Sequence, residues 1–155
     1  MKKLFLLLLL IPLFLNAQLR LSNVYELYVI KSKDVENYVI KGLGFKRLDF
    51  KLNGDSSAFE FYNGKNNFEE AIYVKVLIPH IEKFKNVVTV RTANESYVQE
   101  LKSEITSHGF EYKGEVLVDE KNKIHLYIKD NIIFSISSQK NNNGIYEINI
   151  APKNK

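Results

Sequence analysis

The 155-residue sequence contains no cysteine, no tryptophan and only 3 prolines, and it has no apolar run long enough to span a membrane. The absence of cysteine excludes a disulfide-stapled miniprotein, a thiolate metal site and a cysteine nucleophile. The longest apolar run covers 12 residues, Leu4 to Leu15, whereas a membrane-spanning helix needs about 20. Apolar residues nevertheless make up 45% of the chain, which is enough to bury a core and excludes a disordered tail.

The start of the chain has the organisation of a secretory signal peptide. Lys2 and Lys3 precede the apolar run, and Ala17 supplies the small residue expected at a cleavage site before Gln18. Residues 1–17 are therefore predicted to be a signal peptide, and the mature protein is predicted to be periplasmic or secreted. The alternative is an uncleaved membrane anchor, which so short a run containing a proline serves poorly.

Removal of this segment changes the charge balance. Two of the 22 basic residues leave with it, so 20 basic residues face 18 acidic ones and the formal charge falls from +4 to +2. Nucleic-acid binding requires a concentrated basic face, whereas these charges are interspersed. We expect no nucleic-acid partner, no stable membrane span after cleavage and no cofactor.

The clearest pattern in the mature chain predicts a helix over residues 94–110. Tyr97, Leu101 and Ile105 recur every four residues and form one apolar stripe. Thr92 and Glu95 have the spacing of a capping box at its start. At its end, Gly109 and Phe110 fit a Schellman motif, with the phenylalanine packing back on Ile105.

Residues 33–45 predict an earlier helix that ends in the same way. Val35, Val39 and Leu43 form its apolar row, and Gly44-Phe45 matches Gly109-Phe110 at an offset of 65, which also aligns Ile40 with Ile105. Similarity at a fixed period suggests a duplicated supersecondary unit. Because Gly-Phe is common after helices, chance similarity stays open as the alternative.

Alternating segments predict strands after each helix. In the first half they carry Leu48 to Leu52, Phe59 to Phe61, Ile72 to Ile78 and Val87 to Arg91; in the second half they carry Phe110 to Val118, Ile124 to Ile128, Ile132 to Ile136 and Tyr146 to Ile150. Asn63-Gly64 predicts a tight hairpin, Gly114 a bulge and Asp130-Asn131 a turn. An extra strand is expected around Val24 to Ile30.

These elements predict an α+β fold made of two tandem units, each a helix followed by an antiparallel meander of three or four strands. The helices are expected to pack on one face of the sheet and leave the other face wet. The units are predicted to cover residues 18–92 and 93–155 and to form one compact domain. The helix-plus-four-strand order is loosely similar to that of beta-lactamase inhibitor proteins, although those carry cysteines and larger repeats. This similarity suggests a protein-binding role.

A second resemblance rests on composition. A signal ending Asn16-Ala17-Gln18, with a mature chain rich in Asn, Lys and Ile, resembles small exported proteins of Bacteroidota. It implies export and no particular activity.

The sequence offers little catalytic chemistry. His80, His108 and His125 lack the spacing of a zinc-binding helix, so no metal site is expected. Adjacent carboxylates such as Glu69-Glu70 point to opposite sides of an extended chain and cannot converge on a substrate. No serine-nucleophile or phosphate-loop signature is present. We therefore predict that the protein is not an enzyme and has no catalytic residue.

The remaining candidates lie on strand surfaces. Tyr62, Tyr73 and Tyr127 are expected opposite the apolar rows, with Lys75 nearby. Tyrosine is favoured at interfaces because it combines a large apolar area with a polar tip, although it is also a common strand former. These four residues are the predicted binding site of an exported module, an inhibitor or adaptor whose partner is an envelope or extracellular protein or a glycan.

Two other functions stay open. One is a small-ligand carrier with a cavity between the helices and the sheet. The other is an enzyme whose site, around His80 or His125, is assembled by folding.

Overall fold

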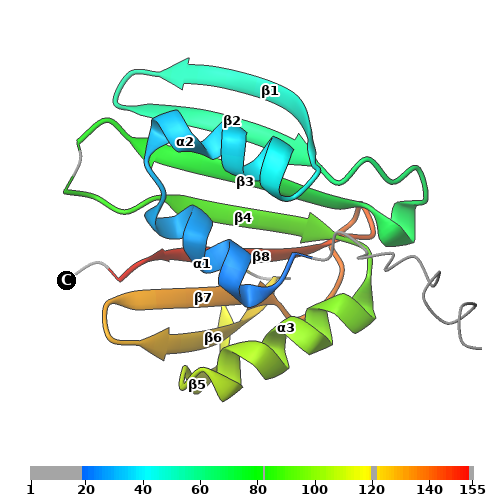
Figure 1. The fold of residues 1–155 in the computed structure, drawn as a ribbon. Coiled ribbons are helices and arrows are strands. Elements are labelled where there is room, and N and C mark those ends of the chain that lie inside the picture. The colour runs from blue at the N-terminus through cyan, green and yellow to red at the C-terminus, as the bar shows by residue number, and fades with distance from the viewer. Residues whose placement is uncertain (1–18, 82, 120–121, 154–155) are drawn as a thin grey trace, which may run out of the picture.

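The structure, a computed structural model, describes residues 19–81, 83–119 and 122–153, so the predicted signal peptide lies outside the described residues. The described chain forms one antiparallel sheet with helices on one side (Figure 1). In chain order the elements are α1 (Leu21–Val29), α2 (Ser32–Glu36), the π-helical η2 (Asn37–Gly42), β1 (Lys46–Asn53), β2 (Ser56–Tyr62), the 3-10 helix η3 (Phe68–Glu70), β3 (Ile72–Pro79), β4 (Val87–Thr92), α3 (Glu95–Ser107), β5 (Glu111–Leu117), β6 (Lys123–Lys129), β7 (Ile132–Ser137) and β8 (Tyr146–Pro152).

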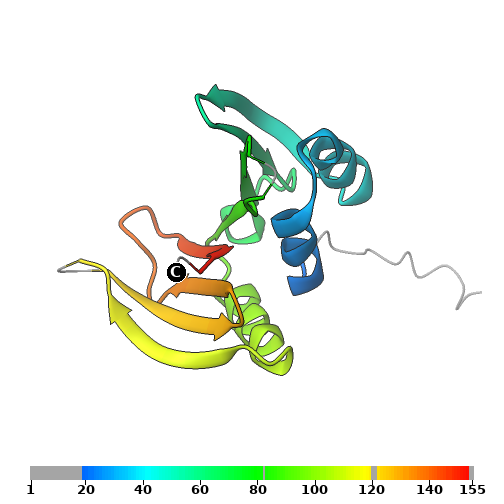
Figure 2. The same ribbon diagram turned by 90° about the vertical axis from the view of Figure 1, so that its left-hand side faces the viewer.

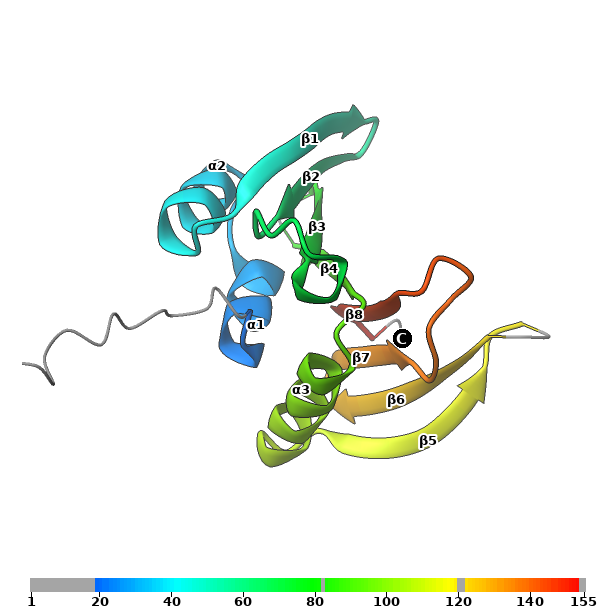
Figure 3. The same cartoon turned by 90° about the vertical axis from the view of Figure 1, so that its right-hand side faces the viewer.

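The sheet has the strand order β1-β2-β3-β4-β8-β7-β6-β5, and every pairing is antiparallel. Figures 2 and 3 show that the sheet is strongly curved and that α1, α2 and α3 all lie on the same side of it. The predicted mixed fold with an antiparallel sheet is therefore confirmed. The helix-covered face holds the core, and we call the opposite face the helix-free face.

The prediction of an extra strand at Val24 to Ile30 is wrong: residues 24–29 belong to α1, and Ile30 is its C-cap. Its alternating β-branched and aromatic residues favour a strand locally. Leu21, Val24, Leu27 and Tyr28 instead share one helical stripe and are buried, and α1 packs over the central strands β4 and β8. Tertiary burial of this stripe outweighs the local preference.

The helix predicted over 94–110 is confirmed as α3, but its start differs from the prediction. The side chain of Asn94 accepts a hydrogen bond from the Tyr97 amide at 2.9 Å, so Asn94 is the N-cap. The predicted capping box of Thr92 and Glu95 is wrong because the Thr92 hydroxyl accepts from the backbone amide of Asn94 at 3.1 Å, rather than from that of Glu95, and donates to the carbonyl of Ala71 at 3.0 Å.

The predicted Schellman end of α3 is confirmed. Gly109 has φ of 81°, its amide donates to Thr106, and the Phe110 amide donates to the Ile105 carbonyl at 3.3 Å. Ile105 and Phe110 are both buried in the core.

The earlier helix ends similarly but contains an extra residue. Gly44 has φ of 72°, and the Phe45 amide donates to the Val39 carbonyl at 3.1 Å. Val39 therefore takes the place that Ile105 has in α3, while Ile40 is 38% exposed. The predicted alignment of Ile40 with Ile105 is wrong because the π-helical turn inserts one residue, as π-bulges do.

The predicted tight turn at Asn63-Gly64 is also wrong. β2 and β3 pair as antiparallel neighbours, but the loop between them covers residues 63–71. The Asn63 carboxamide oxygen accepts from the amide of Ile72 at 3.1 Å, and its NH2 donates to the Glu70 carbonyl at 2.8 Å. Asn63 thus closes a wider loop that contains η3.

The predicted bulge at Gly114 and the predicted turn at Asp130-Asn131 are confirmed. The β5–β6 register shifts beside Gly114, and Asp130 and Asn131 turn the chain between β6 and β7.

Candidate functional site

Eight side chains on the helix-free face form two rows across the strands β2, β3, β4 and β8. Strand register aligns one row as Tyr62, Tyr73, Arg91 and Glu147, and the other as Glu60, Lys75, Thr89 and Asn149. Each residue is two positions from its neighbour on the same strand, so the side chains share one face. The alternate positions on β3, from Ile72 to Ile78, are buried. One set of strands therefore builds both the core and this polar and aromatic surface.

The rows are held by direct contacts between neighbouring strands. The rings of Tyr62 and Tyr73 lie 6.2 Å apart at 20°, and Lys46 Nζ lies 5.9 Å from the Tyr62 ring centroid. On the other side of the face, Arg91 Nε donates to Glu147 Oε2 at 2.8 Å. These contacts fix side chains that are otherwise half-exposed, so the surface is partly ordered before any partner binds.

The second row is also connected. Lys75 Nζ lies 3.4 Å from Glu60 Oε1, and the Thr89 hydroxyl donates to Asn149 Oδ1 at 2.7 Å. Because the charged members of both rows are paired, this surface has little net charge. Exposed ion pairs contribute at most about 1 kcal/mol each, so a partner could open them at small cost.

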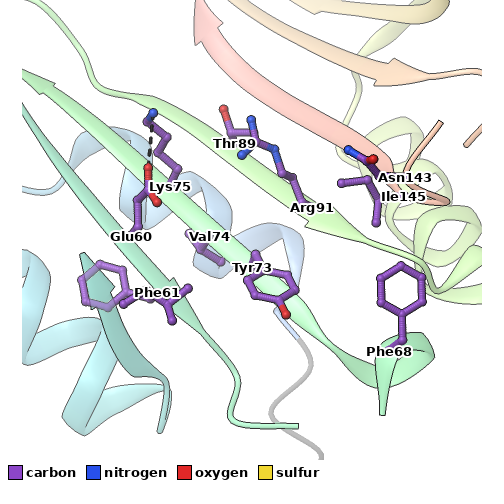
Figure 4. A pocket seen from close by; sticks show the side chains of 11 residues that line it. Glu60, Phe61, Phe68, Tyr73, Val74, Lys75, Thr89, Arg91, Asn143 and Ile145 are labelled. Atoms are coloured by element: carbon purple, nitrogen blue, oxygen red, sulfur yellow. Dashed lines mark ion pairs between the residues drawn. The ribbon is translucent and has the colours of Figure 1, made fainter. Parts of the chain in front are cut away.

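A groove of about 260 Å³ lies over these rows. One wall contains Phe68 from η3, and another contains Asn143 and Ile145 from the β7–β8 loop. Figure 4 shows Phe68 and Ile145 at one end, the Glu60–Lys75 pair at the other, and Tyr73 and Arg91 between them.

The two loops that wall the groove contact each other. Lys140 Nζ lies 3.5 Å from Glu69 Oε1. Gly144 has φ of 74°, and a Cβ built there would lie 3.7 Å from the Phe68 ring. Leu48 adds a further exposed apolar side chain to the lining. The groove thus offers an apolar and aromatic surface bordered by paired charges and hydrogen-bonding groups.

The structure brings three of the four predicted site residues together. Tyr62, Tyr73 and Lys75 are neighbours on the helix-free face. The predicted placement of Tyr127 opposite the apolar rows is wrong: the residue is only 7% exposed, it is the register partner of the buried Phe134, and it borders α3 on the other side of the sheet.

The error at Tyr127 has a physical origin in β6. Ile124, Leu126 and Ile128 occupy the helix-free face and are half-buried there, whereas the helix-covered face of β6 carries His125 and Tyr127 between two lysines. The alternation of β6 therefore indicates the wrong face as the core. A tyrosine also fits beneath a helix, because its ring can be buried while its hydroxyl reaches the edge.

Several lining residues were missed. Arg91 could have been found, since it alternates with buried valines in β4 as Tyr73 does in β3. Phe68 and Ile145 lie outside the strands, and their position depends on how two distant loops meet. An exposed phenylalanine in a polar loop was the only available signal for Phe68.

The histidines do not form a recognisable catalytic arrangement. His80 Nε2 lies 3.1 Å from the Ser57 hydroxyl, but Ser57 is buried. Among the described residues, no hydrogen bond or ion pair joins a carboxylate to His80 in the way a catalytic triad requires. Within that same part of the chain, no group of three or more His, Asp or Glu side chains could hold a metal ion.

His125 lies in a different cluster beside α3. The Tyr112 hydroxyl and His125 Nδ1 are 3.0 Å apart, and Glu115 Oε1 lies 4.0 Å from His125 Nε2. Burial, followed by the charge of Lys102, lowers the pKa of His125, and Glu115 opposes this. The neutral imidazole is therefore favoured, and the contact with Glu115 is not an ion pair at neutral pH.

Comparison with known protein families, curated proteins and solved structures finds no match for this chain. In the parts of the chain that the structure describes, none of the helices has the length and apolar character needed to cross a membrane.

Proposed function

We propose that this protein is an exported, non-enzymatic binding module that docks a protein partner on its helix-free face. The observation that carries the proposal is the groove over β2, β3 and β4, where Tyr73 and Lys75 are joined by Phe68 and Ile145. Tyr62 lies beside Tyr73 on the same face. Aromatic residues surrounded by a polar rim are typical of protein interfaces.

The lining favours a protein segment over a glycan. Leu48, Phe68 and Ile145 provide apolar surface, which suits an apolar or aromatic side chain better than a hydroxyl-covered sugar. Because the charges of the rows are paired, the partner needs no strong charge of either sign. The expected ligand is a segment that inserts one large apolar side chain and makes hydrogen bonds to the rim.

The finer description of the fold also belongs to this proposal. We interpret α2-η2 with β1–β4, and α3 with β5–β8, as two related units. The strand order supports this, since each meander runs from an outer edge to the central β4–β8 pair. The matching glycine ends of the two helices also support it. The loose similarity to beta-lactamase inhibitor proteins rests on the same order and suggests an inhibitor or adaptor.

The test begins with the predicted mature chain, residues 18–155, immobilised and exposed to envelope and culture-medium extracts. Tyr73→Ser is expected to reduce retention of a specific partner by about tenfold or more, the effect of losing an interface hot spot. Tyr25→Ser is the matched control, because Tyr25 is 43% exposed on the helix side and Tyr73 is 38% exposed.

Capture of a partner does not by itself support the proposal. The proposal is supported if retention of that partner is reduced by Tyr73→Ser and is unchanged by Tyr25→Ser. Equal retention by wild type and Tyr73→Ser, with unchanged circular dichroism, would show that the helix-free face is not the docking site. Binding that is lost when the captured material is deglycosylated would replace the protein partner with a glycan.

A further inference from the structure

A second and larger cavity shares no lining residue with the groove. It has a volume of about 600 Å³ and lies where the junction of α1 and α2 meets the end of β3 and the β3–β4 connection. Figure 1 shows that connection beside the start of α2. This volume is within the usual range for small-molecule sites, about 300–1,000 Å³.

A buried asparagine fixes the shape of this cavity. Asn86 is 4% exposed, and its NH2 donates to the carbonyls of Leu27 at 2.8 Å and Ile30 at 2.9 Å. The backbone N–H of Asn86 donates to the carbonyl of Tyr28 at 3.1 Å. These bonds satisfy the end of α1 and tie the β3–β4 connection to it, so the cavity is formed by elements that are held together.

One part of the cavity lining is apolar. Tyr28 and Ile78 form buried surface, and Ile30 and Pro79 continue it. At the mouth, Phe84 is 51% exposed. Exposed large apolar side chains next to a cavity indicate surface that a ligand could cover.

The other part of the lining is cationic. Lys31, Lys33 and Lys85 line the cavity together with His80, and no described carboxylate does so. None of these lysines takes part in an ion pair among the described residues; Glu82, in the same connection, lies outside them. Lys75 and Arg91 on the helix-free face are paired instead. Positive charge is thus concentrated here in a mature chain of nearly balanced charge, and a concave site focuses its field.

We propose that this cavity binds an anionic amphiphile, a carboxylate, phosphate or sulfonate head on an apolar tail. Lys31, Lys33 and Lys85 pair with the head group. The tail lies along Ile30, Ile78 and Phe84. This site goes beyond the proposed docking function and shares none of its residues, so either assignment can fail without the other.

The test titrates dodecanoate, below its micelle concentration, into residues 18–155 by calorimetry, with native mass spectrometry for stoichiometry. One molecule is expected to bind. Affinity should fall by up to about fourfold for each methylene removed from the tail, because each buried methylene contributes to binding. Acetate and dodecyltrimethylammonium, which lack the tail and the anionic head respectively, should not bind measurably.

Substitutions then locate the site. The triple variant Lys31→Gln, Lys33→Gln and Lys85→Gln should weaken dodecanoate binding by at least tenfold. The control, Lys41→Gln with Lys113→Gln and Lys123→Gln, makes the same change of charge elsewhere and should leave the affinity unchanged. Tyr73→Ser should also leave it unchanged, which separates this site from the groove.

The source of the amphiphile is resolved by a second arm with phosphatidylglycerol vesicles. Binding of dissolved dodecanoate supports a soluble ligand. Binding only of vesicles, weakened by the same lysine variant and by Phe84→Ser, supports a bilayer lipid as the source of the same head and tail. Equal binding of the cationic amphiphile, no binding in either arm, or equal weakening by both lysine variants would overturn the proposal.

Discussion

Individual polar side chains do much to connect the helices to the rest of the fold. The Tyr97 hydroxyl donates to the Leu19 carbonyl at 2.6 Å, and the Leu21 amide donates to the Glu104 carboxylate at 2.8 Å. Within the described chain, no buried side-chain nitrogen or oxygen lacks a hydrogen-bond partner. A buried group without a partner would cost about 1–3 kcal/mol. The few polar groups in this core therefore select one arrangement of α1 against α3.

His125 is the residue for which we predict a pH effect on stability. Burial and Lys102 from α3 lower its pKa in the folded state, against Glu115 from β5, whereas an unfolded imidazole has a pKa of about 6.5. The unfolded chain then binds the proton more readily. The contribution of His125 to the free energy of unfolding is therefore fully present above the pKa of the unfolded imidazole. It is lost as the pH falls through that pKa towards the lower pKa of His125 in the folded protein.

Urea unfolding between pH 7.5 and 5 measures this effect. The free energy of unfolding of the wild type should decrease over that range, and His125→Gln should show a shallower decrease because glutamine does not titrate. The amide can still form a hydrogen bond to Tyr112, the partner of His125 at 3.0 Å. Identical slopes for both proteins would mean that His125 has an ordinary proton affinity in the fold.

At the scale of elements, the end of η2 offers a matched pair of glycines. Gly44 has φ of 72° with open space around its Cα, so only its backbone conformation disfavours a side chain. Gly42 is helical, and a Cβ there would meet Tyr38 at 3.9 Å, an ordinary contact. Gly44→Ala should destabilise the protein by about 1–2 kcal/mol, whereas Gly42→Ala should be neutral or stabilise it by up to about 1 kcal/mol. Thermal and urea unfolding of the two variants checks the difference; equal effects would contradict it.

Most elements could be predicted from the sequence because their burial patterns are one-sided. β3 alternates cleanly between buried Ile72 to Ile78 and the helix-free face, and α3 has a single apolar stripe. α1 could not be predicted, since its residues favour a strand locally and only packing over β4 and β8 makes it a helix. The π-helical turn before Gly44 was equally hidden, because one inserted residue leaves the Gly-Phe signal intact.

The candidate site follows the same rule. Tyr62, Tyr73 and Lys75 were predictable because β2 and β3 each have one apolar face. Tyr127 was misplaced because the aliphatic row of β6 lies on the helix-free face instead of in the core. The walls of the groove depend on contacts between loops around residues 68 and 145, which no local pattern encodes. The cationic cavity likewise joins Lys31 and Lys85, which are distant in the sequence. Asn86, next to Lys85, donates to the carbonyl of Ile30, next to Lys31.

For the molecule as a whole, α1 packs across the junction of the two halves of the sheet, which the β4–β8 pairing joins. It lies against β4, the last strand of one meander, and β8, the last strand of the other, and it also contacts α3. Leu27 is fully buried in this position, whereas Val29 on the same helix is 37% exposed. If the chain is one domain, as its length and shared core indicate, a cavity at Leu27 must weaken both halves together.

Leu27→Ala is therefore expected to lower the free energy of unfolding by about 2–5 kcal/mol, the usual cost of such a cavity. Val29→Ala should change it by no more than about 0.5 kcal/mol. Native-state hydrogen exchange distinguishes a shared core from two independent ones: amides of β3 and β7 should lose protection by the same amount in Leu27→Ala. Loss confined to one of these strands would show that the halves unfold separately, because a packing defect propagates only as far as the cooperative unit that contains it.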